Sequence, residues 1–96
     1  MALYLITAIG ESGPAIEKSI AEKYSGNFYK IDPSKWWVSS PATTSKDLSD
    51  QLGITTDPPI VFGTTGIVVA VKGYFGRGPS DMWEWVAAKM SQKPNA

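Results

Sequence analysis

Two residue types that carry much of protein chemistry are missing from this chain of 96 residues, which contains no cysteine and no histidine. Without cysteine the fold has no disulfide, and no thiolate can act as a nucleophile or a metal ligand. Without histidine the chain lacks the commonest general base and the side chain that titrates near neutral pH. We therefore expect a protein that is not an enzyme and that has no catalytic residue, no metal site and no cofactor.

A net charge of either sign is lacking as well, because nine basic residues balance nine acidic ones. Proteins that bind nucleic acid non-specifically usually carry a basic excess, since phosphate contacts supply most of their affinity. No run approaches the roughly 20 apolar residues that cross a bilayer, and the start lacks the basic segment of a signal peptide. These features disfavour a nucleic-acid partner and predict a cytoplasmic protein without a membrane partner.

What the chain does have is a succession of short apolar segments separated by turn residues. The apolar, β-prone run from Ala2 to Ala8 predicts a buried strand. Ile16, Ile20 and Tyr24 then recur every four residues, which predicts an amphipathic helix. Ser12 precedes this segment and is a residue type that caps helix starts.

The middle of the chain predicts a β-hairpin followed by a short helix. Residues 27–31 and the run Lys35–Ser39 are β-prone and are joined by a turn that contains proline. Thr44 and Asp47 have the spacing of a capping box, which predicts a helix start. Gly53 suits the left-handed position that follows the end of a helix.

The C-terminal part contains the most β-prone stretch of the chain, Ile67–Val71. Residues 60–62 could form a short strand before it. A glycine-rich loop follows over Lys72–Pro79 and leads into a helix expected from about residue 80 to residue 91.

The order of these elements is β-α-β-β-α-β with an extra C-terminal helix. Split β-α-β units in this order form an antiparallel sheet with two helices on one face, the ferredoxin-like arrangement. We therefore predict one α+β domain over residues 1–92 and a frayed tail over residues 93–96. The other face of the sheet stays open unless the last helix or a second subunit covers it.

The segment Trp36-Trp37-Val38 is distinctive because this tryptophan-containing strand leads into a helix with a polar cap, over residues 45–52. A later strand ends in the glycine- and aromatic-rich segment Lys72–Gly76. With the order of elements over roughly residues 2–90, these features resemble the Cas2-like and SinR-like small ferredoxin-fold proteins. The resemblance implies the ferredoxin-like fold and a homodimer formed through the sheet.

The same resemblance would place an acidic metal ligand at the end of the first strand of a Cas2-like nuclease. This chain has Thr7-Ala8-Ile9-Gly10 at that place, and the nearest carboxylate, Glu11, is already in the loop. We therefore expect a small non-catalytic interaction domain that acts through a homodimer or through a partner protein on its sheet face. The alternative is a degenerate Cas2-like nucleic-acid binder or metal-dependent nuclease.

Four tryptophans are the candidate partner-binding residues. Trp36 and Trp37 are adjacent on a predicted strand, so their side chains point to opposite faces of the sheet. Trp83 and Trp85 lie about 200° apart around the predicted helix. In each pair one side chain should be exposed, or be covered by the terminal helix, a second copy or a ligand.

A second group of residues fits the nucleic-acid alternative. The segment that contains Tyr74 and Phe75 partly resembles the aromatic signature of RNA-recognition sheets, whose rings stack on bases. Lys35, Lys72 and Arg77 would then contact phosphates or another anion. The competing interpretation is that these aromatic residues pack a loop under the last helix.

Overall fold

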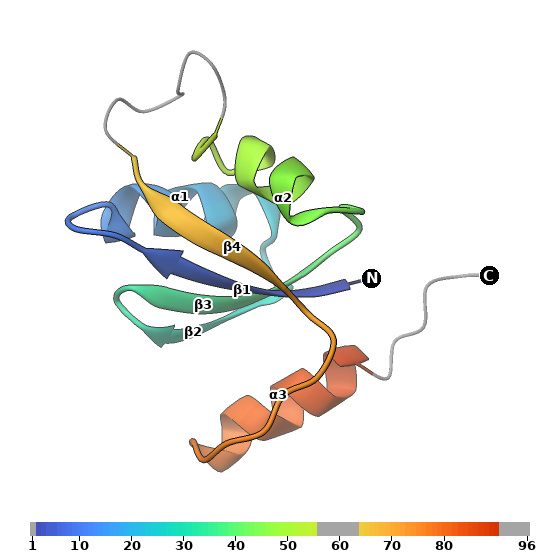
Figure 1. Ribbon diagram of the computed structural model, residues 1–96. Helices are drawn as coiled ribbons and strands as arrows, with labels where there is room; N and C mark the ends of the chain where they lie inside the picture. The colour runs from blue at the N-terminus through green and yellow to red at the C-terminus, as the bar shows by residue number, and fades with distance from the viewer. Residues whose placement is uncertain (1, 56–63, 91–96) are drawn as a thin grey trace.

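A computed structural model of the chain describes residues 2–55 and 64–90. The short strand expected at residues 60–62 and the tail expected at residues 93–96 lie outside these ranges. The described residues form a small α+β fold with a four-stranded antiparallel sheet and three helices (Figure 1). In chain order the elements are β1 (Ala2–Ala8), α1 (Gly13–Lys23), β2 (Phe28–Asp32), β3 (Lys35–Ser40), α2 (Ser45–Gln51), β4 (Gly66–Val71) and α3 (Ser80–Met90).

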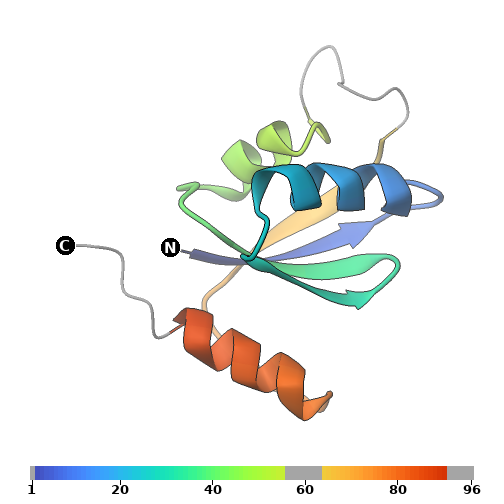
Figure 2. The same cartoon turned by 180° about the vertical axis from the view of Figure 1, so that it is seen from behind.

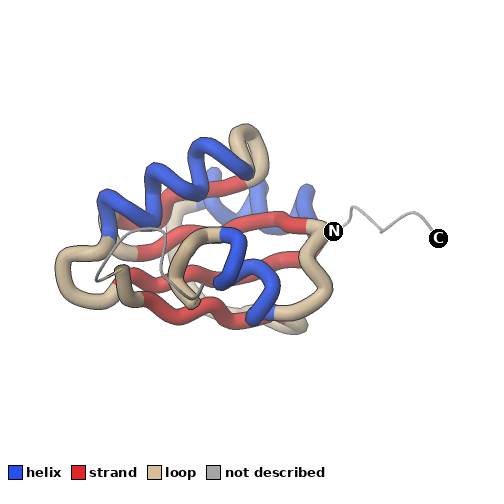
Figure 3. Tube along the Cα trace, turned by 90° about the horizontal axis from the view of Figure 1, so that it is seen from above, coloured by secondary structure: helices blue, strands red, loops and turns tan. Residues whose placement is uncertain are grey.

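The strands lie in the order β2-β3-β1-β4, and every neighbouring pair is antiparallel. They run side by side across the molecule in the view from above (Figure 3). The connection through α1 therefore passes over β3, and the connection through α2 passes over β1. Helices α1 and α2 cover one face of the sheet, and α3 lies on the opposite face (Figures 1 and 2).

The face under α1 and α2 holds the larger of the two apolar clusters. Its side chains come from alternate residues of the strands, as the two-residue period of a strand requires. Ile6, Ile16, Ile20 and Trp36 are completely buried there. The predicted helix face of α1 is thereby confirmed, and this cluster closes one side of the sheet.

Trp37 points to the opposite face, as the alternation of the two adjacent tryptophans predicts. It packs there with Leu3 and with Met82 and Val86 of α3 in a second, smaller cluster. The terminal helix of the same chain therefore covers this part of the sheet. The structure therefore shows that the terminal helix, rather than a second copy or a ligand, covers Trp37.

The ends of α2 form as their sequence predicts. The side chain of Thr44 accepts a hydrogen bond from the backbone N–H of Asp47 at 3.0 Å. Gly53 follows the helix with φ of 82°, in the left-handed region. The N–H of Ile54 donates to the carbonyl of Ser49 at 3.0 Å, which is the long-range bond of a Schellman ending.

The start of α1 differs from its sequence-based expectation. Ser12 occupies the position before the helix, but its side chain makes no capping bond, and its backbone has helical rather than extended dihedrals. Its hydroxyl instead accepts the N–H of Thr65 at 2.9 Å. Ser12 therefore ties the start of α1 to the segment that enters β4, a contact 53 residues away along the chain.

Candidate partner-binding surface

Among the described residues, the large apolar side chains that are exposed within a strand lie on β4. Ile67 is 52% exposed and Val69 is 47% exposed, and both lie on the sheet face that α3 occupies, because they pair with Thr7 and Leu5 of β1. Helix α3 lies closest to β1 and β2, and of the described β4 residues Val71 packs against the apolar cluster under this helix. We call the uncovered pair Ile67 and Val69 the β4 strip.

β4 is also the last strand in the sheet order, and among the described residues it pairs only with β1. We call its outer side the β4 edge. Unpaired N–H and C=O groups along such an edge can accept a strand from another chain. Charged side chains, proline and bulges usually prevent this pairing, and the segment Gly66–Val71 contains no charged residue and no proline.

The hydrogen-bond pattern fixes which backbone groups face the β4 edge. Ile9 and Thr65 continue the register of the β1–β4 pair, and the N–H of Ile9 donates to the carbonyl of Thr65 at 3.1 Å. Hydrogen-bonded positions alternate along an antiparallel pair, so the odd-numbered residues of β4 bond to β1. The residues whose N–H and C=O groups point outward are Gly66, Val68 and Ala70.

The opposite edge of the sheet, formed by β2, is protected. Lys30 and Asp32 bring charge to this strand, and its register with β3 is irregular between these two residues. Tyr29 packs against Trp85 of α3 with a ring-centroid distance of 6.2 Å, and its hydroxyl donates to Asp81 at 2.7 Å. The two sheet edges therefore differ in charge, regularity and cover.

The four candidate tryptophans lie in three different environments. Trp36 and Trp37 are buried within the chain, at 0% and 8% exposure, so a partner of the folded protein cannot reach their rings. Trp85 is half-buried beside Tyr29, with the ammonium group of Lys89 5.8 Å from its ring centroid. Trp83 is half-buried on another side of α3.

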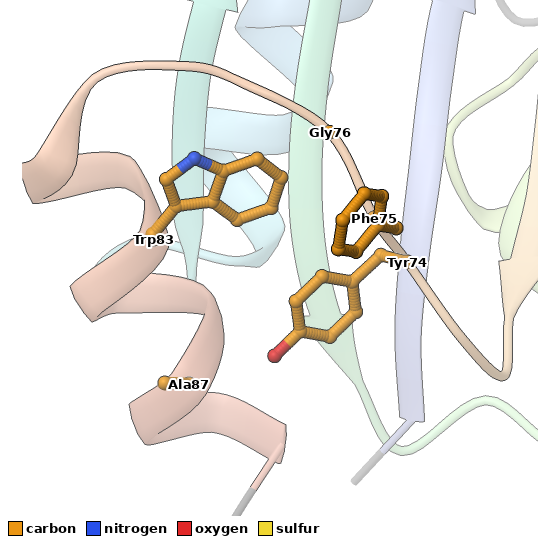
Figure 4. Close-up of a pocket in the computed structure, with 5 residues that line it drawn as sticks. All are labelled: Tyr74, Phe75, Gly76, Trp83 and Ala87. Carbon is orange, nitrogen blue, oxygen red and sulfur yellow. The ribbon is translucent and has the colours of Figure 1, made fainter.

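Trp83 contributes to a pocket of about 310 Å³ between α3 and the loop that precedes it. Its indole ring stacks on the ring of Tyr74 with a centroid distance of 5.6 Å and an interplanar angle of 12°. Figure 4 shows Phe75 beside Tyr74, on the loop that faces the helix. The pocket, which we call the aromatic pocket, is lined by Tyr74, Phe75, Gly76, Trp83 and Ala87.

The three basic candidates do not form one patch. Lys35 pairs with Asp32 at 3.3 Å and lies opposite Thr7, near the end of β1. Lys72 directly follows Val71, the last residue of β4, which lies opposite Leu3 near the start of β1. Along β1 the two positions are separated by on the order of 15 Å. Arg77 is exposed in the same loop as Lys72.

One carboxylate on α1 has structural partners. The carboxylate of Glu17 accepts the ammonium group of Lys30 at 2.8 Å and the indole N–H of Trp36 at 3.4 Å. These two hydrogen bonds, first that from Lys30, hold the pKa of Glu17 below its ordinary value. Within residues 2–55 and 64–90, no three acidic side chains gather as a metal site would require.

No helix in the described part of the chain has the length and apolar character needed to cross a membrane. No protein-family model, no curated protein and no solved structure matches the chain. The fold alone defines its class, a small α+β protein on a four-stranded antiparallel sheet. Its candidate functional features are the β4 edge, the β4 strip and the aromatic pocket.

Proposed function

We propose that this protein is a non-catalytic interaction domain of the ferredoxin-like type that binds a partner by strand addition at the β4 edge. Two helical connections that each pass over one strand of an antiparallel sheet support the ferredoxin-like assignment. The chain also lacks histidine and cysteine, which supports a role in binding rather than catalysis.

A single observation carries the proposal: β4 combines outward-facing backbone groups with an exposed, uncharged apolar strip. In strand addition the main-chain hydrogen bonds supply affinity, and alternate side chains supply specificity. The outward N–H and C=O groups of Val68 and Ala70 would form the main-chain hydrogen bonds. The side chains of Ile67 and Val69 would provide the specificity. An edge of this kind without a partner would promote uncontrolled association.

The test uses a β-strand probe, a peptide with the sequence of residues 65–71. Amide exchange of Val68 and Ala70 should slow when the peptide binds, because their N–H groups become hydrogen bonded. Val69→Lys should abolish this protection by placing a charge in the β4 strip. Ile9→Lys is the matched control, since Ile9 has the same exposed fraction of 47% but lies outside β4. The exchange is measured at a dilution at which the chain sediments as a monomer, and unchanged exchange there at a saturating peptide concentration would rule out strand addition at this edge.

The aromatic pocket favours a second candidate function, binding of single-stranded nucleic acid. Tyr74, Phe75 and Trp83 offer ring faces within one pocket, and exposed Lys72 and Arg77 lie in the same loop. Stacking of bases on aromatic rings beside cationic groups is how many single-strand binders work. The resemblance to Cas2-like proteins points to the same class of partner.

An oligothymidylate titration monitored by tryptophan fluorescence tests this second function. Binding should quench Trp83, weaken with salt, and lose about 1–3 kcal/mol in Phe75→Ala through loss of one stacked base. Ala88→Ser, on the exposed side of the same helix, should leave the affinity unchanged. No quenching at low salt and about 100 µM protein would exclude this function, because non-specific affinity reaches that range.

A further inference from the structure

We propose that the strand added to the β4 edge is β4 of a second copy of this chain, antiparallel and related by a two-fold axis at Val68. This inference rests on the proposed strand-adding function and names its partner. It would join the sheets of two copies into one continuous sheet with the same surface used on both sides, as a two-fold interface requires.

The hydrogen-bond pattern of β4 is complementary to itself in one register. Its outward backbone groups belong to Gly66, Val68 and Ala70. In an antiparallel pair, hydrogen-bonded residues lie directly opposite each other. With the axis at Val68, this residue faces its own copy, and Gly66 faces Ala70 of the partner subunit. All the outward groups of the strand then find partners, which no other two-fold register achieves.

The same register brings the β4 strips of the two copies together. Ile67 lies opposite Val69 of the partner subunit, at a position without direct hydrogen bonds, where side chains approach most closely. Both side chains are about half exposed in the single chain. Pairing would bury apolar surface against apolar surface on the part of the α3 face that this helix leaves uncovered. A slip of one residue would send the strips to opposite faces and lose this contact.

Charge also permits two copies to approach. Residues Gly66–Val71 contain no charged side chain, so the paired strands bring no like charges face to face. The whole chain has a formal net charge of zero, which removes the long-range repulsion that keeps many proteins monomeric. The β2 edge cannot pair with its own copy in the same manner, because Lys30, Asp32 and an irregular register interrupt it.

The absence of native cysteine makes disulfide trapping a direct test of the register. Chains carrying Ile67→Cys are mixed with differently tagged chains carrying Val69→Cys and are oxidised gently. Opposite positions of this kind have Cα atoms about 4.5 Å apart, within reach of a disulfide, whereas identical positions lie diagonally at about 7–8 Å. The mixed disulfide should therefore exceed both homodisulfides several-fold. Ile9→Cys mixed with Val69→Cys is the control and should form little product.

Sedimentation equilibrium of the intact chain completes the test. The wild-type protein should form dimers, Val69→Lys should be monomeric with an unchanged circular dichroism spectrum, and Ile9→Lys should remain dimeric. A dimer that survives Val69→Lys, or homodisulfides that exceed the mixed product, would overturn the Val68 axis. A wild-type monomer whose Val68 and Ala70 amides are still protected by the strand peptide would overturn self-pairing and leave strand addition intact. A monomer that also ignores the peptide would overturn both.

Discussion

The two faces of the sheet are built from the same strands but are covered to different extents. Under α1 and α2, Trp36 is fully buried and its indole N–H donates to Glu17. Under α3, the indole nitrogen of Trp37 is buried without a hydrogen-bond partner among the described residues, and Val69 is half exposed. Helices that connect strands of the sheet close one face, whereas a helix added after the last strand covers only part of the other.

Replacing Trp36 by alanine should produce the largest loss of stability among the substitutions that compare the two faces. The substitution removes a fully buried indole from the closed face and leaves a cavity, for an expected loss of about 3–5 kcal/mol in unfolding free energy. Trp85→Ala, at a half-buried ring on the other face, should cost clearly less. Urea denaturation of both variants measures the difference. Equal losses would show that the two faces contribute alike to stability.

A glycine at the start of α1 provides the second prediction. A Cβ atom added to Gly13 would lie 2.6 Å from the carbonyl oxygen of Pro33, which belongs to the backbone and cannot move aside cheaply. Gly13→Ala should therefore destabilise the closed face by about 1–3 kcal/mol, the usual cost of overpacking.

The control for this substitution lies in the loop on the other side of the sheet. At Gly73 an added Cβ would meet nothing within 4 Å, so Gly73→Ala should leave stability close to that of the wild type. Thermal unfolding of the two variants gives the comparison. If Gly13→Ala were as stable as Gly73→Ala, the close approach of α1 to the β2–β3 turn would not constrain the fold.

Local sequence chemistry predicts much of this fold. The alternation at Trp36 and Trp37, the cap at Thr44 and the left-handed Gly53 each depend on a few neighbouring residues, and each is confirmed. The role of Ser12 was not predictable in the same way. Its hydroxyl bonds to a residue far along the chain rather than to its own helix, and only the folded topology brings the two together.

The candidate site was predicted less well for the same reason. An apolar run such as Ile67–Val71 is typical of a buried strand, and nothing in its own residues indicates that it lies at the edge of the sheet. Tyr74 and Phe75 are candidate nucleic-acid contacts from the sequence, but the pocket that they line also needs Trp83. That contact forms because the loop folds back along α3, which sequence spacing does not reveal.

The smallest expected effect is the pH-dependent contribution of Glu17 to the stability of the closed face. The hydrogen bonds from Lys30 and Trp36 lower the pKa of Glu17 below its ordinary value of 4.5. A carboxyl whose pKa is lower in the folded state contributes stability above the unfolded pKa and loses it as pH falls through the folded pKa. Because the side chain of Glu17 is 37% exposed, the contribution should be at most about 1 kcal/mol.

Glu17→Gln should therefore be less stable than the wild type near neutral pH, with the difference fading as pH falls below about 4.5. Lys30→Gln should reproduce much of this loss, because it removes the same hydrogen bond from the other side. Urea denaturation over a pH series measures both. A stability difference that stayed constant down to strongly acidic pH would mean that Glu17 acts through packing rather than charge.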